Sequence, residues 1–108
     1  MKESIIQRGV MDYLTMIETS HNLYWFRSAA GAVQTVSGRY FKTGRPGAPD
    51  VTVCWSGKFI GIEIKSEIGT MSPAQKRAKA QIEAAGGEYH IVRSIADIKA
   101  VFASAVPG

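Results

Sequence analysis

Asp50, Glu63 and Lys65 are residues of the types that bind a divalent cation and stabilise a negatively charged substrate group. Carboxylate oxygens are preferred ligands of hard ions such as Mg²⁺. A lysine ammonium group near the same ion adds a positive charge that stabilises a reacting anion. This chemistry requires the two carboxylates to lie close together in space, although they are well separated along the chain.

The segment between the two acids predicts a β-hairpin that would bring them together. The runs 51–55 and 58–65 are rich in β-branched and aromatic residues, and a Ser-Gly pair between them suits a two-residue turn. In the register set by this turn, Asp50 lies directly opposite Glu63, with Cβ atoms roughly 4.5–5.5 Å apart. A slip of one residue would mix polar and aliphatic side chains on both faces, so the pattern favours this register.

The same register assigns each hairpin side chain to a face. The aliphatic side chains share one face, which is expected to pack on the core: Val51, Val53, Ile60, Ile62 and Ile64. The other face carries Asp50, Glu63 and Lys65, and Gly61 is expected to leave open space there for a substrate phosphate. A solvated polar face with an incidental ion pair is the alternative. It does not explain why two acids, a lysine and a glycine share one face.

Two further residues could complete this site. Glu3 lies at the inward edge of a helix expected over 3–18 and could reach the same cation directly or through water. An acid at a helix N-terminus is also favourable with the helix dipole, so its position has a structural alternative. Gln75 follows Ser72 by three residues, so it could close a capping box, act in the site, or both.

The rest of the chain predicts one domain of the α/β or α+β class, in which a mixed central sheet is flanked by helices, in the order α-β-β-β-α-β-α. The hairpin supplies two of the strands. The other elements in this order are helices over 3–18, from Ser72-Pro73 to Gly86-Gly87 and after Ser94, and strands over 23–29 and 88–92, with loops over 31–38 and 44–49. The segment 39–43 is a further, short strand candidate. The length of 108 residues suits a single domain over 1–108.

Charge and cysteine content narrow the class of protein. The net charge is +4, and the segment 27–79 holds nine basic and three acidic residues. Such a segment is typical of a phosphate-binding surface, although a solvated basic face is an alternative. The candidate DNA contacts within it are Arg39, Lys42, Arg45, Lys76, Arg77 and Lys79. One cysteine excludes an internal disulfide framework and a multi-cysteine zinc site, and it fits a reducing cytoplasmic setting.

These motifs resemble those of a known nuclease family. Pro49-Asp50 followed by Glu63-Ile64-Lys65 matches the P-D…(D/E)-x-K motif of the PD-(D/E)XK nuclease superfamily. The surrounding residues are similar to the VRR-Nuc (virus-type replication–repair nuclease) family: Glu3, Gly47-Ala48-Pro49, Gly61-Ile62, Ser66, Gly69, Ser72-Pro73, Gln75 and Ala85-Gly86-Gly87. The similarity extends over roughly residues 3–99 and is greatest to the stand-alone phage and prophage members.

The resemblance implies a PD-(D/E)XK-like core and cleavage of DNA phosphodiesters that depends on Mg²⁺ or Mn²⁺. By motif position, Asp50, Glu63 and the Ile64 carbonyl would bind the metal, and Glu3 would match the acid of the family's first helix. Lys65 would orient the attacking water or stabilise charge on the phosphate. Gln75 would support Lys65 or that water.

The resemblance also implies a partner and an assembly. Stand-alone members are associated with homodimers that act on branched DNA such as four-way (Holliday) junctions, in bacterial or phage-infected cells. A C2 dimer would make two symmetric cuts, and the aromatic run 24–26 and the last helix are candidate interfaces, although packing in the core explains these two elements equally well. The alternatives are a restriction-type or flap nuclease of the same superfamily, or a DNA-binding module without catalysis. No membrane association is expected.

Overall fold

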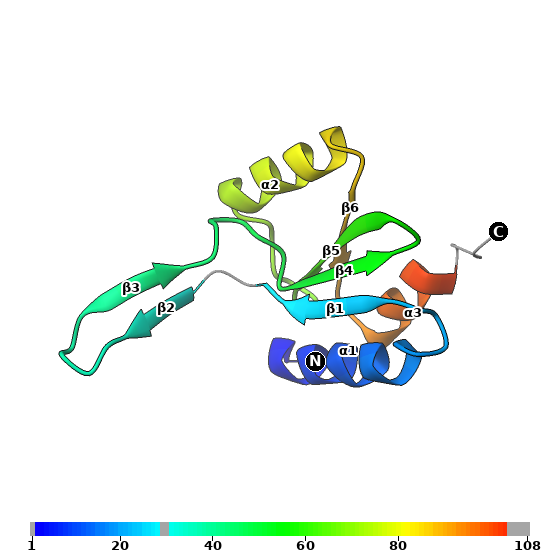
Figure 1. Ribbon diagram of the computed structural model, residues 1–108, viewed down its shortest axis with the longest axis horizontal. Helices are drawn as coiled ribbons and strands as arrows, with labels where there is room; N and C mark the ends of the chain where they lie inside the picture. The colour runs from blue at the N-terminus through cyan, green and yellow to red at the C-terminus, as the bar shows by residue number, and fades with distance from the viewer. Residues whose placement is uncertain (1, 29–30, 104–108) are drawn as a thin grey trace.

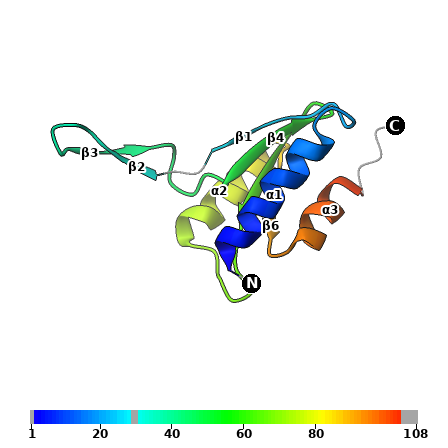
Figure 2. The same ribbon diagram turned by 90° about the horizontal axis from the view of Figure 1, so that it is seen from below.

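The computed structural model describes residues 2–28 and 31–103, which form three layers (Figure 1). The elements follow the order α1 (Glu3–Ile17), β1 (Tyr24–Arg27), β2 (Gly31–Gln34), β3 (Tyr40–Thr43), β4 (Val51–Trp55), β5 (Lys58–Ile64), α2 (Pro73–Ala84), β6 (Glu88–Val92) and α3 (Ile95–Ala103). Helices α1 and α3 cover one face of the main sheet, and α2 lies over the opposite face (Figures 1 and 2). In the described part of the chain, no helix is long and apolar enough to cross a membrane.

The main sheet is mixed and has the strand order β1-β4-β5-β6. The pairs β1–β4 and β4–β5 are antiparallel, and β5–β6 is parallel. The β4–β5 register pairs Val51 with Ile62 and Val53 with Ile60, which confirms the register expected from the two-residue turn. Ser56 and Gly57 both have positive φ, as a type I′ turn requires. The predicted fold class is therefore confirmed.

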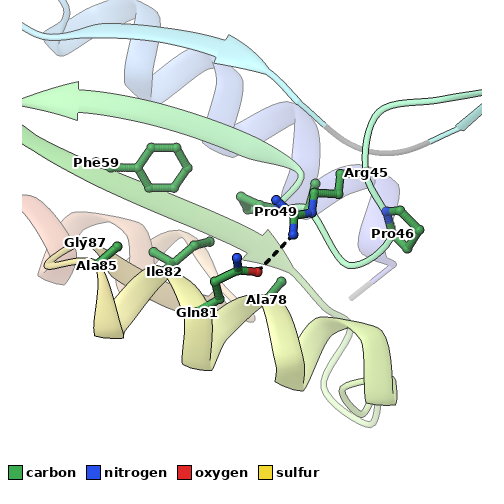
Figure 3. A pocket seen from close by; sticks show the side chains of 10 residues that line it. Arg45, Pro46, Pro49, Phe59, Ala78, Gln81, Ile82, Ala85 and Gly87 are labelled. Atoms are coloured by element: carbon green, nitrogen blue, oxygen red, sulfur yellow. Dashed lines mark hydrogen bonds between the residues drawn. The ribbon is translucent and has the colours of Figure 1, made fainter.

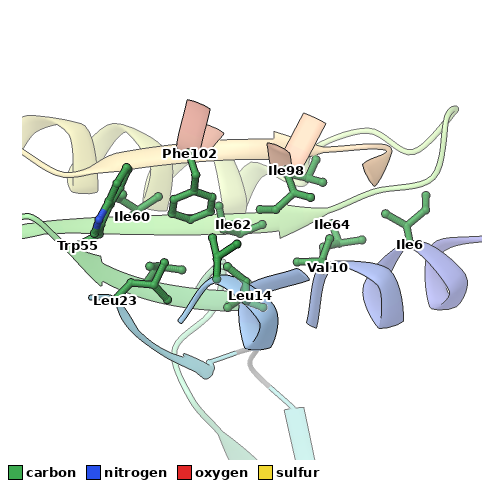
Figure 4. Close-up of a cluster of buried hydrophobic side chains, with 14 residues drawn as sticks. Ile6, Val10, Leu14, Leu23, Trp55, Ile60, Ile62, Ile64, Ile98 and Phe102 are labelled. Carbon is green, nitrogen blue, oxygen red and sulfur yellow. The ribbon is translucent and has the colours of Figure 1, made fainter. Parts of the chain in front are cut away.

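A single cluster of buried side chains lies between the sheet and the helices α1 and α3 (Figure 4). The hairpin contributes its aliphatic face, in which Val51, Val53 and Ile62 have no exposed area. Helix α1 adds Ile6, Val10, Leu14 and Ile17, and α3 adds Ile98 and Phe102. Because this cluster fixes which face of β4 and β5 is buried in the core, it also fixes which face carries Asp50 and Glu63.

The segment 31–38, expected to be a loop, contains the strand β2. It pairs with β3 in a separate antiparallel sheet, with Gly31 opposite Thr43 and Gln34 opposite Tyr40. This hairpin projects from the body of the molecule (Figures 1 and 2). The expected order α-β-β-β-α-β-α therefore lacked this projecting hairpin. The strand predicted over 23–29 corresponds to β1, and its last residue, 29, lies outside the described residues, as does residue 30.

Candidate active site

The two acids predicted to form a pair meet at one end of the β4–β5 hairpin. Asp50 immediately precedes β4, and Glu63 is the penultimate residue of β5. The Ile64 N–H donates to Asp50 Oδ2 at 2.7 Å, and the Ser28 N–H donates to the Asp50 carbonyl oxygen at 2.9 Å. Asp50 is therefore held at its backbone by the residue that follows β1 and at its carboxylate by β5.

Glu63 is buried, with 4% of its surface exposed, among polar groups from three other segments. Gln75 Nε2, at the start of α2, donates to Glu63 Oε2 at 2.9 Å. Lys65 Nζ lies 3.8 Å from the same oxygen, and the Tyr89 hydroxyl, on β6, donates to Glu63 Oε1 at 3.5 Å. The structure thus gathers the four predicted catalytic residues, Asp50, Glu63, Lys65 and Gln75, in one place.

The surroundings of Glu63 disfavour its charged form. Burial and, next, the negative charge of Asp50 raise the pKa of Glu63 to about 7, although the Lys65 ammonium group acts in the opposite direction. Burial and the same two carboxylates also raise the pKa of Tyr89 above its usual value. A site that holds two carboxylates with one nearby lysine has an excess of negative charge, and hard divalent cations fit this set of oxygen ligands.

Gln75 serves two roles that the sequence left open. Its backbone N–H donates to Ser72 Oγ at 3.1 Å, and its Oε1 accepts from the Ser72 N–H at 2.9 Å, which completes a capping box at the start of α2. Because the amide oxygen is used in the cap, the amide nitrogen is directed to Glu63. The capping box therefore fixes the orientation of a residue in the site.

Gly61 does not leave the open space that the sequence suggested. A Cβ atom at this position would lie 2.9 Å from Cγ of Pro49 and 3.4 Å from Cδ2 of Tyr89. The space above Gly61 is therefore filled by the ring of Pro49, which is buried, and bordered by the ring of Tyr89. Because Gly61 has no side chain, Pro49 can pack against β5, and this packing positions Asp50 beside Glu63.

Glu3 is exposed at the first turn of α1, and the structure does not bring it to the acid pair. Over residues 2–28 and 31–103, no group of three or more His, Cys, Asp or Glu side chains is arranged to hold a metal ion. The acidic side chains that meet here are thus Asp50 and Glu63, and the Ile64 backbone N–H donates to the first of them. A direct role for Glu3 has no support in this geometry.

Two residues near the site have no local signal in the sequence. Tyr89 reaches Glu63 because β6 pairs in parallel with β5, with Tyr89 opposite Gly61. The Arg93 Nη1 group donates to the carbonyl oxygens of Ser66 and Gly69, both at 2.7 Å. Arg93 thereby fixes the loop that follows Lys65.

The candidate DNA-binding residues occupy several parts of the surface. Lys76 and Arg77 are exposed on the first half of α2, and Lys79 on the same helix forms an ion pair with Glu83. Arg45, in the glycine- and proline-rich loop, donates from Nη2 to Gln81 Oε1 at 3.1 Å. The remaining two belong to the projecting hairpin: Arg39 is exposed just before β3, and Lys42 lies within it.

Comparison with solved structures identifies the fold. A structure described as "VRR_NUC domain" matches with a TM-score of 0.64, over 96% of this chain and 97% of that one, at 18% sequence identity. The chain has the fold of a VRR_NUC domain. No family model matches the sequence. No curated protein matches it either. The VRR_NUC fold predicted from the motifs is thus confirmed by structural similarity.

Proposed function

We propose that the chain is a divalent-cation-dependent endodeoxyribonuclease that hydrolyses DNA phosphodiesters. The observation that carries this proposal is the buried Glu63 beside Asp50, with Lys65 Nζ 3.8 Å from Glu63 Oε2. Placing two carboxylates together is unfavourable without a cation, and a protein that only binds the DNA backbone gains nothing from them. The VRR_NUC fold supports the same reaction class by analogy.

Each residue of the site has a role in this proposal. The carboxylates of Asp50 and Glu63, with the Ile64 carbonyl, would hold Mg²⁺ or Mn²⁺. When bound, such an ion offsets phosphate charge and lowers the pKa of a coordinated water. Lys65 stabilises negative charge on the phosphate or orients the attacking water. Gln75 holds the Glu63 carboxylate in place through its hydrogen bond to Oε2.

We further propose that the substrate is branched DNA, such as a four-way junction, and that the active form is a homodimer. A two-fold symmetric junction needs two symmetric cuts, and this chain has one pair of acids on one hairpin, so a C2 dimer would supply both sites. Sedimentation of the protein alone and with a junction measures the stoichiometry. A monomer in both states would exclude the dimer and leave the cleavage chemistry untouched.

The test of the nuclease proposal is a cleavage assay on labelled four-way junction, flap, nicked and linear duplex DNA, with Mg²⁺, Mn²⁺ or EDTA. We expect cutting that EDTA abolishes, and a loss of roughly 10²-fold or more in rate for Asp50→Asn and Glu63→Gln, since each removes a carboxylate that would hold the metal ion. DNA binding by these variants should be unchanged or tighter, because a negative charge near the phosphates has been removed.

Glu83→Gln is the matched control, because it removes an exposed acid on α2 whose ion pair with Lys79 lies outside the site. With DNA at saturating concentration, it should cut at the wild-type rate. If wild-type protein binds DNA but cuts none of the four substrates with either metal, the alternative of a non-catalytic DNA-binding module holds and the nuclease proposal fails.

A further inference from the structure

A groove lies between helix α2 and β5, on the face of the sheet opposite the buried cluster (Figure 1). None of the residues of α2 is fully buried. The groove has a volume of about 390 Å³ and lies between α2 and the face of the hairpin that carries Phe59 (Figure 3). A volume of this size is within the range of pockets that bind small organic groups, roughly 300–1,000 Å³.

The walls of the groove are apolar, and one end is polar. Pro49, Phe59, Ala78 and Ile82 are among the residues that form the walls. The Phe59 side chain is large and apolar, yet 43% of its surface is exposed. At the polar end, Arg45 Nη2 donates to Gln81 Oε1, as the dashed line in Figure 3 shows. None of the residues lining the groove is acidic.

The polar end of the groove is equipped to donate hydrogen bonds. The Gln81 amide oxygen already accepts from Arg45, so the Gln81 amide nitrogen and the other guanidinium N–H groups are the side-chain groups at this end that remain to meet a ligand. All of these atoms are donors. A ligand suited to the groove therefore has a flat apolar face and an edge with hydrogen-bond acceptors.

The groove lies next to the candidate active site. Pro49 lines the groove, and the next residue is Asp50. Helix α2 carries Gln75 at Glu63 and Gln81 at the groove, and this spacing corresponds to about 9 Å along a helix that rises 1.5 Å per residue. That distance corresponds to about two to three nucleotides of a strand that advances about 3.4 Å each.

We propose that this groove binds one unpaired nucleobase of the DNA, a few nucleotides from the cleaved phosphodiester, an inference that rests on the proposed nuclease function. A base has the required shape: its face would stack on Phe59, and its edge carries acceptors such as the N7 and O6 atoms of guanine. The positive charge of Arg45 and the absence of acids along the lining suit a polyanionic strand. A base paired and stacked within a duplex cannot enter, so the groove selects DNA with an unpaired segment.

The test measures binding in EDTA, so that cleavage does not interfere. The probe is a forked duplex with 2-aminopurine or an abasic site at the first, second or third unpaired nucleotide. Ala78→Leu fills the groove from α2 without a change of charge, and Phe59→Ala removes the stacking surface. Ala80→Leu is the matched control, because it makes the same change at an exposed position of α2 that does not line the groove.

For the wild type and Ala80→Leu, we expect 2-aminopurine fluorescence to change on binding at one position. An abasic site at that position should weaken binding about 10-fold or more, in keeping with the usual contribution of a stacked base. Ala78→Leu and Phe59→Ala should bind abasic and normal forks equally. The proposal fails if Ala78→Leu behaves as Ala80→Leu does, or if no abasic position affects the wild type.

The same experiment separates other occupants and the underlying function. If Ala78→Leu alters the sedimentation coefficient but not DNA binding, a second copy of the chain covers the groove and the proposal is wrong. If the wild type responds to the abasic site but never cuts DNA in Mg²⁺ or Mn²⁺, the groove proposal stands and the nuclease proposal fails. If the wild type cuts DNA normally and no abasic position affects its binding, the nuclease proposal stands and the groove proposal fails.

Discussion

Glu63 is the residue whose charge state the rest of the site controls. Its carboxyl group is buried beside Asp50, and its pKa of about 7 compares with 4.5 for the ordinary side chain. Between these two values the native protein binds more protons at Glu63 than the unfolded chain does. The free energy of unfolding of the metal-free protein therefore falls as the pH rises.

We expect the contribution of Glu63 protonation to the free energy of unfolding of the metal-free protein to be largest below about pH 4.5. This contribution is lost as the pH rises through about 7. At about 1.36 kcal/mol per pKa unit, the rise of the pKa from 4.5 to about 7 corresponds to a loss of about 3 kcal/mol. Denaturant unfolding in EDTA at pH 5 and pH 8 measures it. Glu63→Gln should remove most of the difference, and Glu83→Gln should keep it. Equal pH dependence in Glu63→Gln and the wild type would contradict the assignment.

The sequence predicted the position of some site residues and missed others for a physical reason. Asp50, Glu63 and Lys65 belong to one hairpin, whose two-residue turn and aliphatic face set the register. Tyr89 comes to Glu63 through a parallel pair, whose register no turn determines. The packing of Pro49 on Gly61 was missed because the path of the loop over the sheet depends on tertiary contacts.

The first turn of α2 affects both the stability of this helix and the geometry of the candidate active site. Ser72 caps the helix, and Gln75 uses its amide oxygen in the capping box and its amide nitrogen at Glu63. Gly47, with a φ of 81°, lies so close to this turn that a Cβ atom would be 2.1 Å from the Ala74 carbonyl oxygen. The loop before Asp50 and the start of α2 are thus fitted to each other.

Ser72→Ala should lower both stability and cleavage. Loss of the cap costs about 1 kcal/mol, or roughly 4–8 °C in Tm, and releases the backbone that orients Gln75. Ser94→Ala is the matched control, because Ser94 Oγ accepts from the Asp97 N–H at the start of α3, away from the acid pair. The two variants should melt at similar temperatures, and kcat should fall several-fold only in Ser72→Ala. A parallel fall in both would mean that the cap acts through global stability alone.

Among the secondary-structure elements, the projecting hairpin is the one that the sequence patterns did not predict. The strand β2 comprises Gly-Ala-Val-Gln, which lacks the alternation of apolar and polar side chains that marks a half-buried strand. Its partner β3 was expected as a strand, and the pairing of the two could not be inferred from composition. By contrast, the apolar stripe of α1 and the Ser-Pro pair at the start of α2 were sufficient to predict these two helices, because both signals are local in the sequence.

For the whole molecule, the excess of positive charge in the middle of the chain should make DNA binding strongly dependent on salt. If the six candidate basic residues all contact phosphates, the logarithm of the binding constant should fall with the logarithm of salt concentration with a slope of about −5. Lys76→Ala should make this slope shallower by about one, whereas Lys79→Ala should change it less, because Lys79 is paired with Glu83. Titrations at several salt concentrations measure the slopes. Equal effects of the two variants would contradict the prediction that the ion pair with Glu83 reduces the contribution of Lys79 to DNA binding.

The separation between the core and α2 has a consequence for local unfolding. The hairpin β4–β5 is held by the buried cluster, whereas α2 contributes no buried residue. Amide hydrogen exchange should therefore be faster in α2 than in the central strands, since a segment with little buried surface opens at a lower free energy. Mild heating or dilute urea would then detach Gln75 from Glu63 while the sheet stays intact, so the protein would lose its catalytic geometry before it melts.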